Sequence, residues 1–126
     1  MQIVDTDVLI DVQRGHQPAI DWFSSLVDLP GVTGFSIMEL IQDAADLRSV
    51  KATTALVDGL PVFWPSATDC QAALDSFKRF HVSHRLGLLD ALIAYTAIGV
   101  GAELCTFNTK HFKVVPNLTL VRPYGR

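Results

Sequence analysis

Cysteine is scarce in this sequence, and its two copies are not placed for a disulfide framework or a zinc site. Cys70 and Cys105 are far apart, with no Cys-x-x-Cys pair and no cysteine–histidine cluster beside either. Both kinds of site need several such residues at close spacing. We therefore expect each cysteine to be a small buried hydrophobic residue.

Long apolar runs and a basic leader are also missing. The 126-residue chain opens with Met1-Gln2-Ile3-Val4-Asp5, and no run approaches the roughly 18 apolar residues of a membrane span. No signal peptide is recognisable either. The sequence thus predicts a cytoplasmic protein without membrane association.

Charged residues make up only 18% of the chain, against roughly 25% in average domains, while 49% of residues are hydrophobic. Either a second chain covers apolar surface, or the α/β core is simply well filled. The net charge of −3 argues against a strongly basic, non-specific nucleic-acid binder. It leaves room for an enzyme with an acidic metal site and a local basic rim.

Segments typical of strands alternate with segments typical of helices along a chain of single-domain length. We expect one domain over residues 1–126, an α/β fold in which a mostly parallel sheet of about five strands lies between helical layers. The expected strands are 2–4, 32–33, 61–64, 103–106 and 118–121. The expected helices are 8–14, 18–26, 36–45, 50–60, 68–80 and 88–98, with a helical turn at 110–112. In helix 68–80, one apolar face would hold Ala73, Leu74, Phe77 and Phe80.

Asp5, Thr6 and Asp7 follow the first predicted strand. The carboxyl ends of strands in open α/β sheets are where ligands bind, but aspartate is also favoured in turns and as a helix cap. Because one helix start needs one cap, we expect Asp7 to cap the helix and Asp5 to be a ligand.

Three later polar residues have similar settings. Glu39 is either a catalytic residue or part of a capping box with Ser36. Asp90 lies in the first turn of an apolar helix, where burial is costly without a partner or a cation. Asn108 follows a predicted strand, where an amide can turn, cap or bind a water. Converging carboxylates would repel one another unless a hard cation such as Mg²⁺ lay among them.

Four short motifs in this order resemble the PIN-domain family, and in particular the VapC-type toxins of toxin–antitoxin pairs. They are Val4–Ile10, Ser36–Leu40, Asp90–Ala97 and Thr106–Phe112. The resemblance extends from Ile3 to about Val121. It implies an endoribonuclease that depends on Mg²⁺ or Mn²⁺.

The resemblance also implies roles for single residues. The metal ligands would be Asp5, Glu39 and Asp90, and the catalytic set would add Asn108. The family often has aspartate at this fourth position, and an amide brings no charge, so a second metal would bind weakly or only with substrate. A basic stretch ahead of Asp90 is either a solvated helix end or a rim for RNA phosphates; it contains Lys78, Arg79, His81, His84 and Arg85.

Two other functions fit parts of the sequence. Asp5-Thr6-Asp7-Val8-Leu9 matches the nucleophile motif of haloacid-dehalogenase-like phosphatases by letter, but that class needs a further acid pair late in the chain, where Asp90 stands alone. A non-catalytic interaction module is the third interpretation, because Asn108 carries no charge and the chain is apolar.

The expected partners are RNA as substrate, a second copy of the chain in a homodimer, and a VapB-like antitoxin. The early helices contain more apolar residues than one small core can take, so some should line a surface groove for an amphipathic antitoxin helix. These residues are Ile20, Trp22, Phe23, Leu26, Ile37, Leu40 and Ile41.

Overall fold

The computed structural model describes all residues 1–126 and contains a five-stranded sheet. Every neighbouring pair of strands is parallel, in the order β3-β2-β1-β4-β5. The strands are β1 (Gln2–Val4), β2 (Gly31–Thr33), β3 (Val62–Phe63), β4 (Glu103–Cys105) and β5 (Leu120–Val121). The five strands and their parallel pairing confirm the prediction from the sequence.

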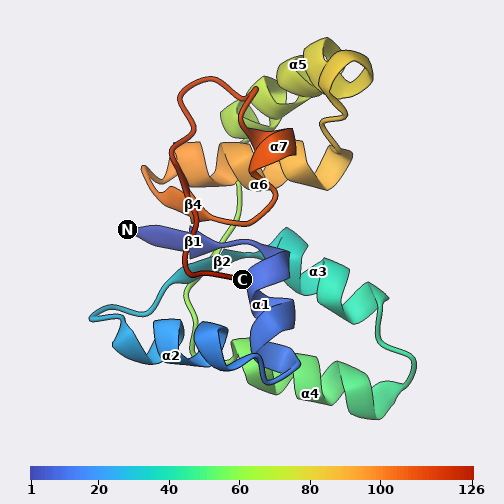
Figure 1. Cartoon of the computed structure of the whole chain (residues 1–126). Helices are drawn as coiled ribbons and strands as arrows, with labels where there is room; N and C mark the ends of the chain where they lie inside the picture. Colours follow the sequence, from blue (N-terminus) through green and yellow to red (C-terminus); the bar gives the residue numbers. More distant parts are fainter.

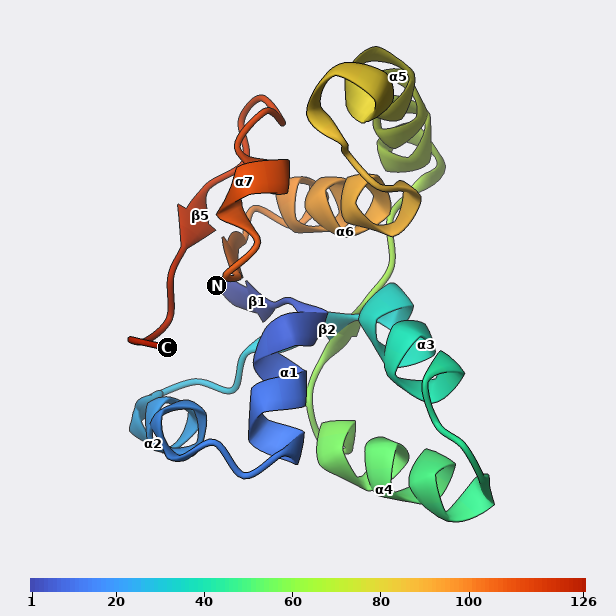
Figure 2. The same ribbon diagram turned by 45° about the vertical axis from the view of Figure 1, so that its right-hand side comes forward.

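Helices cover both faces of the sheet (Figure 1). One layer contains α1 (Thr6–Gln13), α2 (Gln17–Ser25), α3 (Gly34–Gln42) and α4 (Leu47–Val57). The other contains α5 (Ala67–His84), α6 (Leu88–Gly99) and the short α7 (Thr109–Phe112). The rotated view shows the same separation, with α5 as the outermost helix beyond α6 (Figure 2). The expected three-layer α/β/α arrangement is thus confirmed.

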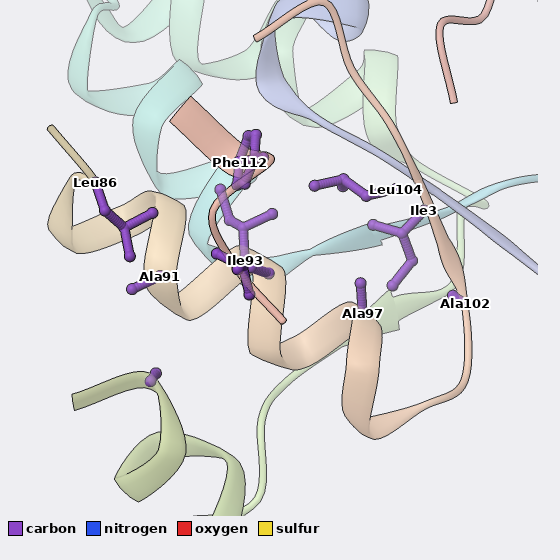
Figure 3. Packing of buried hydrophobic residues seen from close by; sticks show 11 residues of the cluster. Ile3, Leu86, Ala91, Ile93, Ala97, Ala102, Leu104 and Phe112 are labelled. Atoms are coloured by element: carbon purple, nitrogen blue, oxygen red, sulfur yellow. The ribbon is translucent and has the colours of Figure 1, made fainter. Parts of the chain in front are cut away.

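The two hydrophobic cores follow from the two-residue period of the central strands. Ile3 and Leu104 point toward α6 and join the larger core with Ile93 and Phe112 (Figure 3). Their neighbours Val4 and Cys105 join the core beneath α1, α3 and α4. Cys105 is buried as predicted, and this desolvation raises the pKa of its thiol to about 12.

The strand order places a topological switch at the centre of the sheet. From β1 the chain builds β2 and β3 on one side, then returns to build β4 and β5 on the other. The connections that leave β1 and β4 therefore diverge from adjacent strands. The crevice outside the carboxyl ends of two such strands is where open α/β sheets bind ligands. Asp5 and Thr106 directly follow these two strands.

Helix α5 departs from its prediction. It begins with a capping box between Ser66 and Asp69 but continues to His84, four residues beyond the predicted end. It packs mainly on α6, so only a narrow stripe of α5 is covered. Cys70 lies beside that stripe and is exposed, so its predicted burial was wrong. Leu74, which was predicted to share the apolar face of this helix, is exposed as well.

No helix in the structure is both long enough and apolar enough to span a bilayer.

Candidate metal-binding and catalytic site

Asp5 lies between the end of β1 and the start of α1. Its carboxylate Oδ1 accepts a hydrogen bond from the backbone N–H of Thr6 (2.8 Å), and Oδ2 accepts one from the Thr106 hydroxyl (2.7 Å). Only 6% of the residue is exposed. Asp5, not Asp7, is therefore the N-cap, because α1 begins at Thr6, two residues earlier than predicted.

Asp7 instead makes a contact that was not predicted from the sequence. Its Oδ2 accepts a hydrogen bond from the backbone N–H of Phe107 (2.9 Å), so it joins the first turn of α1 to the loop after β4. Its Oδ1 is buried without a hydrogen-bond partner. A buried carboxylate oxygen with no partner is costly, and this oxygen lacks a hydrogen-bond donor.

Thr106 connects the loop after β4 to Asp5. Its hydroxyl donates to Asp5 and also accepts the backbone N–H of Asn108 (3.0 Å). Asn108 occupies the residue before α7, but its side chain makes no capping hydrogen bond. The amide of Asn108 is thus available for other contacts. Thr106 was not predicted as a site residue, although its place directly after a strand was the available signal.

Glu39 lies on α3 and points toward the start of α1. The N-cap of α3 is Thr33, whose hydroxyl accepts the N–H of Ser36 (3.2 Å), so the alternative of a Ser36–Glu39 capping box was wrong. Because α3 begins at Gly34, Glu39 is beyond the first turn. Its Oε1 instead accepts a hydrogen bond from the Thr6 hydroxyl (2.9 Å).

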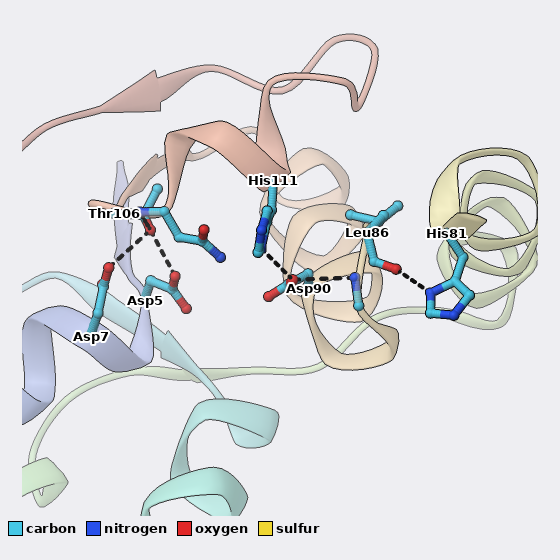
Figure 4. Close-up of polar contacts among 9 residues, drawn as sticks. Asp5, Asp7, His81, Leu86, Asp90, Thr106 and His111 are labelled. Atoms are coloured by element: carbon cyan, nitrogen blue, oxygen red, sulfur yellow. Dashed lines mark hydrogen bonds and ion pairs between the residues drawn. The ribbon is translucent and has the colours of Figure 1, made fainter. Parts of the chain in front are cut away.

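Asp90 is in the first turn of α6, as predicted, and is held from two sides. Its Oδ2 accepts the N–H of Gly87 (3.3 Å) and lies 4.0 Å from Nδ1 of His111 (Figure 4). A Cβ atom at residue 87 would lie 3.0 Å from this oxygen, so glycine permits the close approach. His111 was not predicted as a site residue, although it belongs to the motif that ends at Phe112.

The basic stretch ahead of Asp90 occupies the last turns of α5 and the residue after it, and its members are exposed at the helix end. The ring of His81 is fixed by a 2.8 Å hydrogen bond between Nδ1 and the carbonyl oxygen of Leu86, which Figure 4 shows on the Asp90 side of the site. Arg79 packs over the Phe80 ring, with its guanidinium carbon 5.0 Å from the centroid.

The carboxylates share one electrostatic environment. Burial, together with the charges of Asp7 and Asp90, raises the pKa of Asp5 to about 7. Burial likewise raises the pKa of Glu39, with Asp90 again among the contributing charges. Burial also raises the pKa of Asp7. The charge of Asp90 acts on both Asp5 and Glu39, and the hydroxyl of Thr6, the residue after Asp5, hydrogen-bonds Glu39.

The sequence of this chain also matches a known protein family. A family model described as "PIN domain" matches residues 3–118. The chain belongs to the PIN-domain family.

Proteins similar to this PIN domain include two ribonucleases of Mycobacterium tuberculosis. Ribonuclease VapC10 is 36% identical over 123 residues, which cover 94% of this chain and 90% of the relative. Ribonuclease VapC19 is 29% identical over 121 residues, which cover 94% of this chain and 97% of the relative.

Solved structures share the fold of this PIN domain. A toxin–antitoxin complex from Klebsiella pneumoniae contains a chain that superposes with a TM-score of 0.80 at 24% identity, with full coverage of both chains. VapBC2 from Rickettsia felis, bound to a DNA fragment from its promoter, gives a TM-score of 0.77 at 21% identity, with 95% and 96% coverage. The family assignment removes the phosphatase alternative.

The candidate ligands of this PIN domain have the chemistry that a hard divalent ion prefers. Asp5, Glu39 and Asp90 offer only oxygen, and a cation would offset both the burial and the neighbouring negative charges that raise the pKa of Asp5. No three His, Cys, Asp or Glu side chains are close enough to hold an ion by themselves. Mg²⁺ commonly binds one or two carboxylates and keeps several waters, so two of these acids would be enough to hold it.

The site is at the open edge of the sheet. A cavity of about 640 Å³ lies near the amino ends of the strands beside Met1, Pro30 and Phe63, and none of the candidate acids lines it.

Proposed function

We propose that this chain is an endoribonuclease that depends on Mg²⁺ or Mn²⁺ and acts as the toxin of a VapBC-type pair, with residues 1–126 as one nuclease domain. The observation that carries the proposal is the group of Asp5, Glu39 and Asp90 at the switch point of a PIN-domain sheet. The pKa of Asp5, raised to about 7, supports a role in holding a cation.

Each acid has a distinct part in the proposed hydrolysis. Asp5 and Asp90 hold the ion, which supplies Lewis-acid stabilisation of the charge on the scissile phosphate when it is bound. Thr6 fixes Oε1 of Glu39, so Oε2 can take the proton of the attacking water. The water oxygen bonds to phosphorus, one P–O ester bond breaks, and the departing oxygen takes a proton from solvent. Asn108 contributes an uncharged amide beside this centre.

The purified protein is expected to cleave members of a panel of single-stranded and structured RNAs in Mg²⁺ or Mn²⁺. Cleavage should stop when a chelator removes the ion and return when Mg²⁺ is added back, because the acids alone repel phosphate. Gel analysis of end-labelled RNA gives the measurement. Intact RNA under all metal conditions would favour the non-catalytic interaction module, and phosphate release from a small phosphomonoester would contradict the proposal.

We further propose that the chain forms a homodimer and binds a small VapB-like antitoxin. An apolar groove of about 180 Å³ lies between α1, α2 and α4, and supports the proposed binding of an antitoxin. Its lining includes Ile20, Phe23 and Leu56. An amphipathic helix can bury an apolar face in such a groove. By contrast, Leu40, which was also considered for a groove, belongs to the core.

Light scattering at about micromolar concentration should report twice the monomer mass, as expected for a homodimer. Co-expression with the product of a small neighbouring gene should give a stable complex in which RNA cleavage is lost. Ile20→Asp should weaken that complex more than Asp21→Ala, because Asp21 is an exposed residue one position away. A monomeric mass would contradict the proposed homodimer. Harmless expression of the protein alone, in the absence of any small partner gene, would contradict the proposed antitoxin.

A further inference from the structure

The segment after β5 folds back against α1 and the loop after β4. The Tyr124 hydroxyl donates to Oδ2 of Asp11 (2.8 Å), and Nη2 of Arg126 lies 3.2 Å from Oδ1 of the same carboxylate. The Tyr124 ring also packs edge-on against Phe107, with ring centroids 4.8 Å apart. The end of the chain is therefore anchored beside the site rather than free.

Two arginines of this segment share one aromatic ring. The guanidinium carbons of Arg122 and Arg126 lie 5.2 Å and 4.6 Å from the centroid of Phe107. Cation–π contacts at this distance restrain a guanidinium while leaving its N–H groups free to donate. Phe107 in turn directly precedes Asn108, and its own N–H binds Asp7. Both positive charges are thus fixed one residue from the proposed catalytic set.

The two arginines differ in what neutralises them. Arg126 is paired with Asp11, whereas Arg122 is exposed and has no carboxylate within ion-pair distance. A cation that is held in place but left without a counter-charge is ready for an anionic ligand. The neighbouring acids make a phosphate polymer difficult to bind unless such a cation is close by.

The position of Arg122 also complements the basic end of α5. Figure 4 shows Asp5 and Asp7 on one side of the site and Asp90 on the other, with His81 of α5 beyond Asp90. Arg122 belongs to the Asp7 side, through Phe107. Arg122 thus lies on the Asp7 side of the row of acids and the basic end of α5 on the Asp90 side, so a strand that crosses the row could meet basic side chains at both ends.

We propose that Arg122, positioned on the Phe107 ring, binds a backbone phosphate of the RNA strand on the Asp7 side of the catalytic acids. This inference rests on the proposed ribonuclease function. Arg126 has a structural part, because its charge is already paired with Asp11 and holds the segment in place. The planar guanidinium of Arg122 suits two phosphate oxygens at once, so lysine would substitute only in part.

The test compares Arg122→Ala, Arg122→Lys and Arg48→Ala, where Arg48 is an exposed arginine in the first turn of α4. For Arg122→Ala we expect KM for a single-stranded RNA to rise roughly threefold to tenfold with kcat little changed. The slope of log KM against log salt should fall by about 0.7, the value for one phosphate contact on a single strand. Arg48→Ala, with the same change in net charge, should behave as wild type, and Arg122→Lys should be intermediate.

A binding measurement separates this inference from the proposed function. Anisotropy of a fluorescent RNA, measured with each arginine change in the Asp5→Asn background, reports affinity without cleavage. Equal KM, salt slope and affinity for Arg122→Ala and Arg48→Ala would overturn the role of Arg122 even if the wild type cleaves RNA. If the wild type cleaves nothing, a selective loss of RNA affinity in Arg122→Ala would still support the contact, whereas absence of any RNA binding would overturn it. A melting curve close to wild type for Arg122→Ala shows that the fold is retained.

Discussion

Asp5→Asn is expected to lower RNA cleavage by at least about 100-fold, because mutation of residues that only support a metal ligand already costs 10–100-fold. The metal-free protein should nevertheless melt at the same temperature as wild type or a few degrees higher. The change removes one negative charge from a buried group in which Asp7 and Asp90 act on Asp5. Loss of activity together with retained stability would identify a functional residue rather than a structural one.

The hydrogen bonds of Asp5 allow this substitution. An asparagine Oδ1 can still accept the N–H of Thr6, and its Nδ2 group would face the Thr106 hydroxyl, which can turn to accept it. The matched control is Asp28→Asn, which removes the same charge from an exposed residue outside the site. The control should retain full activity. A large fall in melting temperature for Asp5→Asn alone would show that the carboxylate is needed for the fold, and would contradict the proposal.

The fold was largely predictable from the sequence because strong local signals agreed with one another. The short apolar runs that end at Asp5 and Thr106, and the helical segments between strands, define a parallel α/β sheet almost by themselves. Errors arose where burial depends on a distant neighbour. Cys70 and Leu74 have the apolar character of core residues, yet α5 has only α6 to pack against, so part of its apolar face stays uncovered.

The sequence pointed to candidate site residues but not to their contacts. Asp5 was correctly placed after a strand and Asp90 in the first turn of a helix, whereas Glu39 lies beyond the first turn of α3. The sequence could not decide which residue caps which helix. A shift of two residues in a helix start reverses that decision, as the roles of Asp5 and Asp7 show. Thr106 and His111 become visible only when distant segments meet, since their partners Asp5 and Asp90 are far away in the chain.

The stability of the metal-free protein is expected to fall as the pH rises from about 5 to about 8, a trend opposite to that of proteins stabilised by paired carboxylates. The folded-state pKa of Asp5 is about 7, against an ordinary value of 3.8. Between these two values the folded protein holds a proton that the unfolded chain has lost. The stability contributed by this proton is therefore fully present below pH 3.8 and is lost as the pH rises through about 7.

Other groups in the structure do not reverse this trend. Burial raises the pKa of Glu39 and Asp7, which adds to the loss in the same direction. Desolvation alone would raise the pKa of Asp11, but hydrogen bonds from Tyr124 and Arg126 and the charge of Arg126 lower it. A lowered pKa acts as the pH falls, below the ordinary value for aspartate, so Asp11 contributes no slope in the window of interest.

The expected loss from Asp5 is about 2 kcal/mol between about pH 5 and pH 7, since a group loses at most about 1.4 kcal/mol per pH unit. This corresponds to a fall of roughly 5–10 °C in the melting temperature of a domain of this size. Thermal melts in a chelator across this range provide the measurement, and Asp5→Asn should flatten the slope while Asp28→Asn should keep it. Added Mg²⁺ should stabilise the wild type more at about pH 8 than at about pH 5, because protons compete with the ion for the same carboxylates. Two results would contradict this prediction: a melting temperature that rises with pH in the chelator, or a pH slope that Asp5→Asn leaves unchanged. Either would show that the buried carboxylate of Asp5 does not cause the pH dependence of stability.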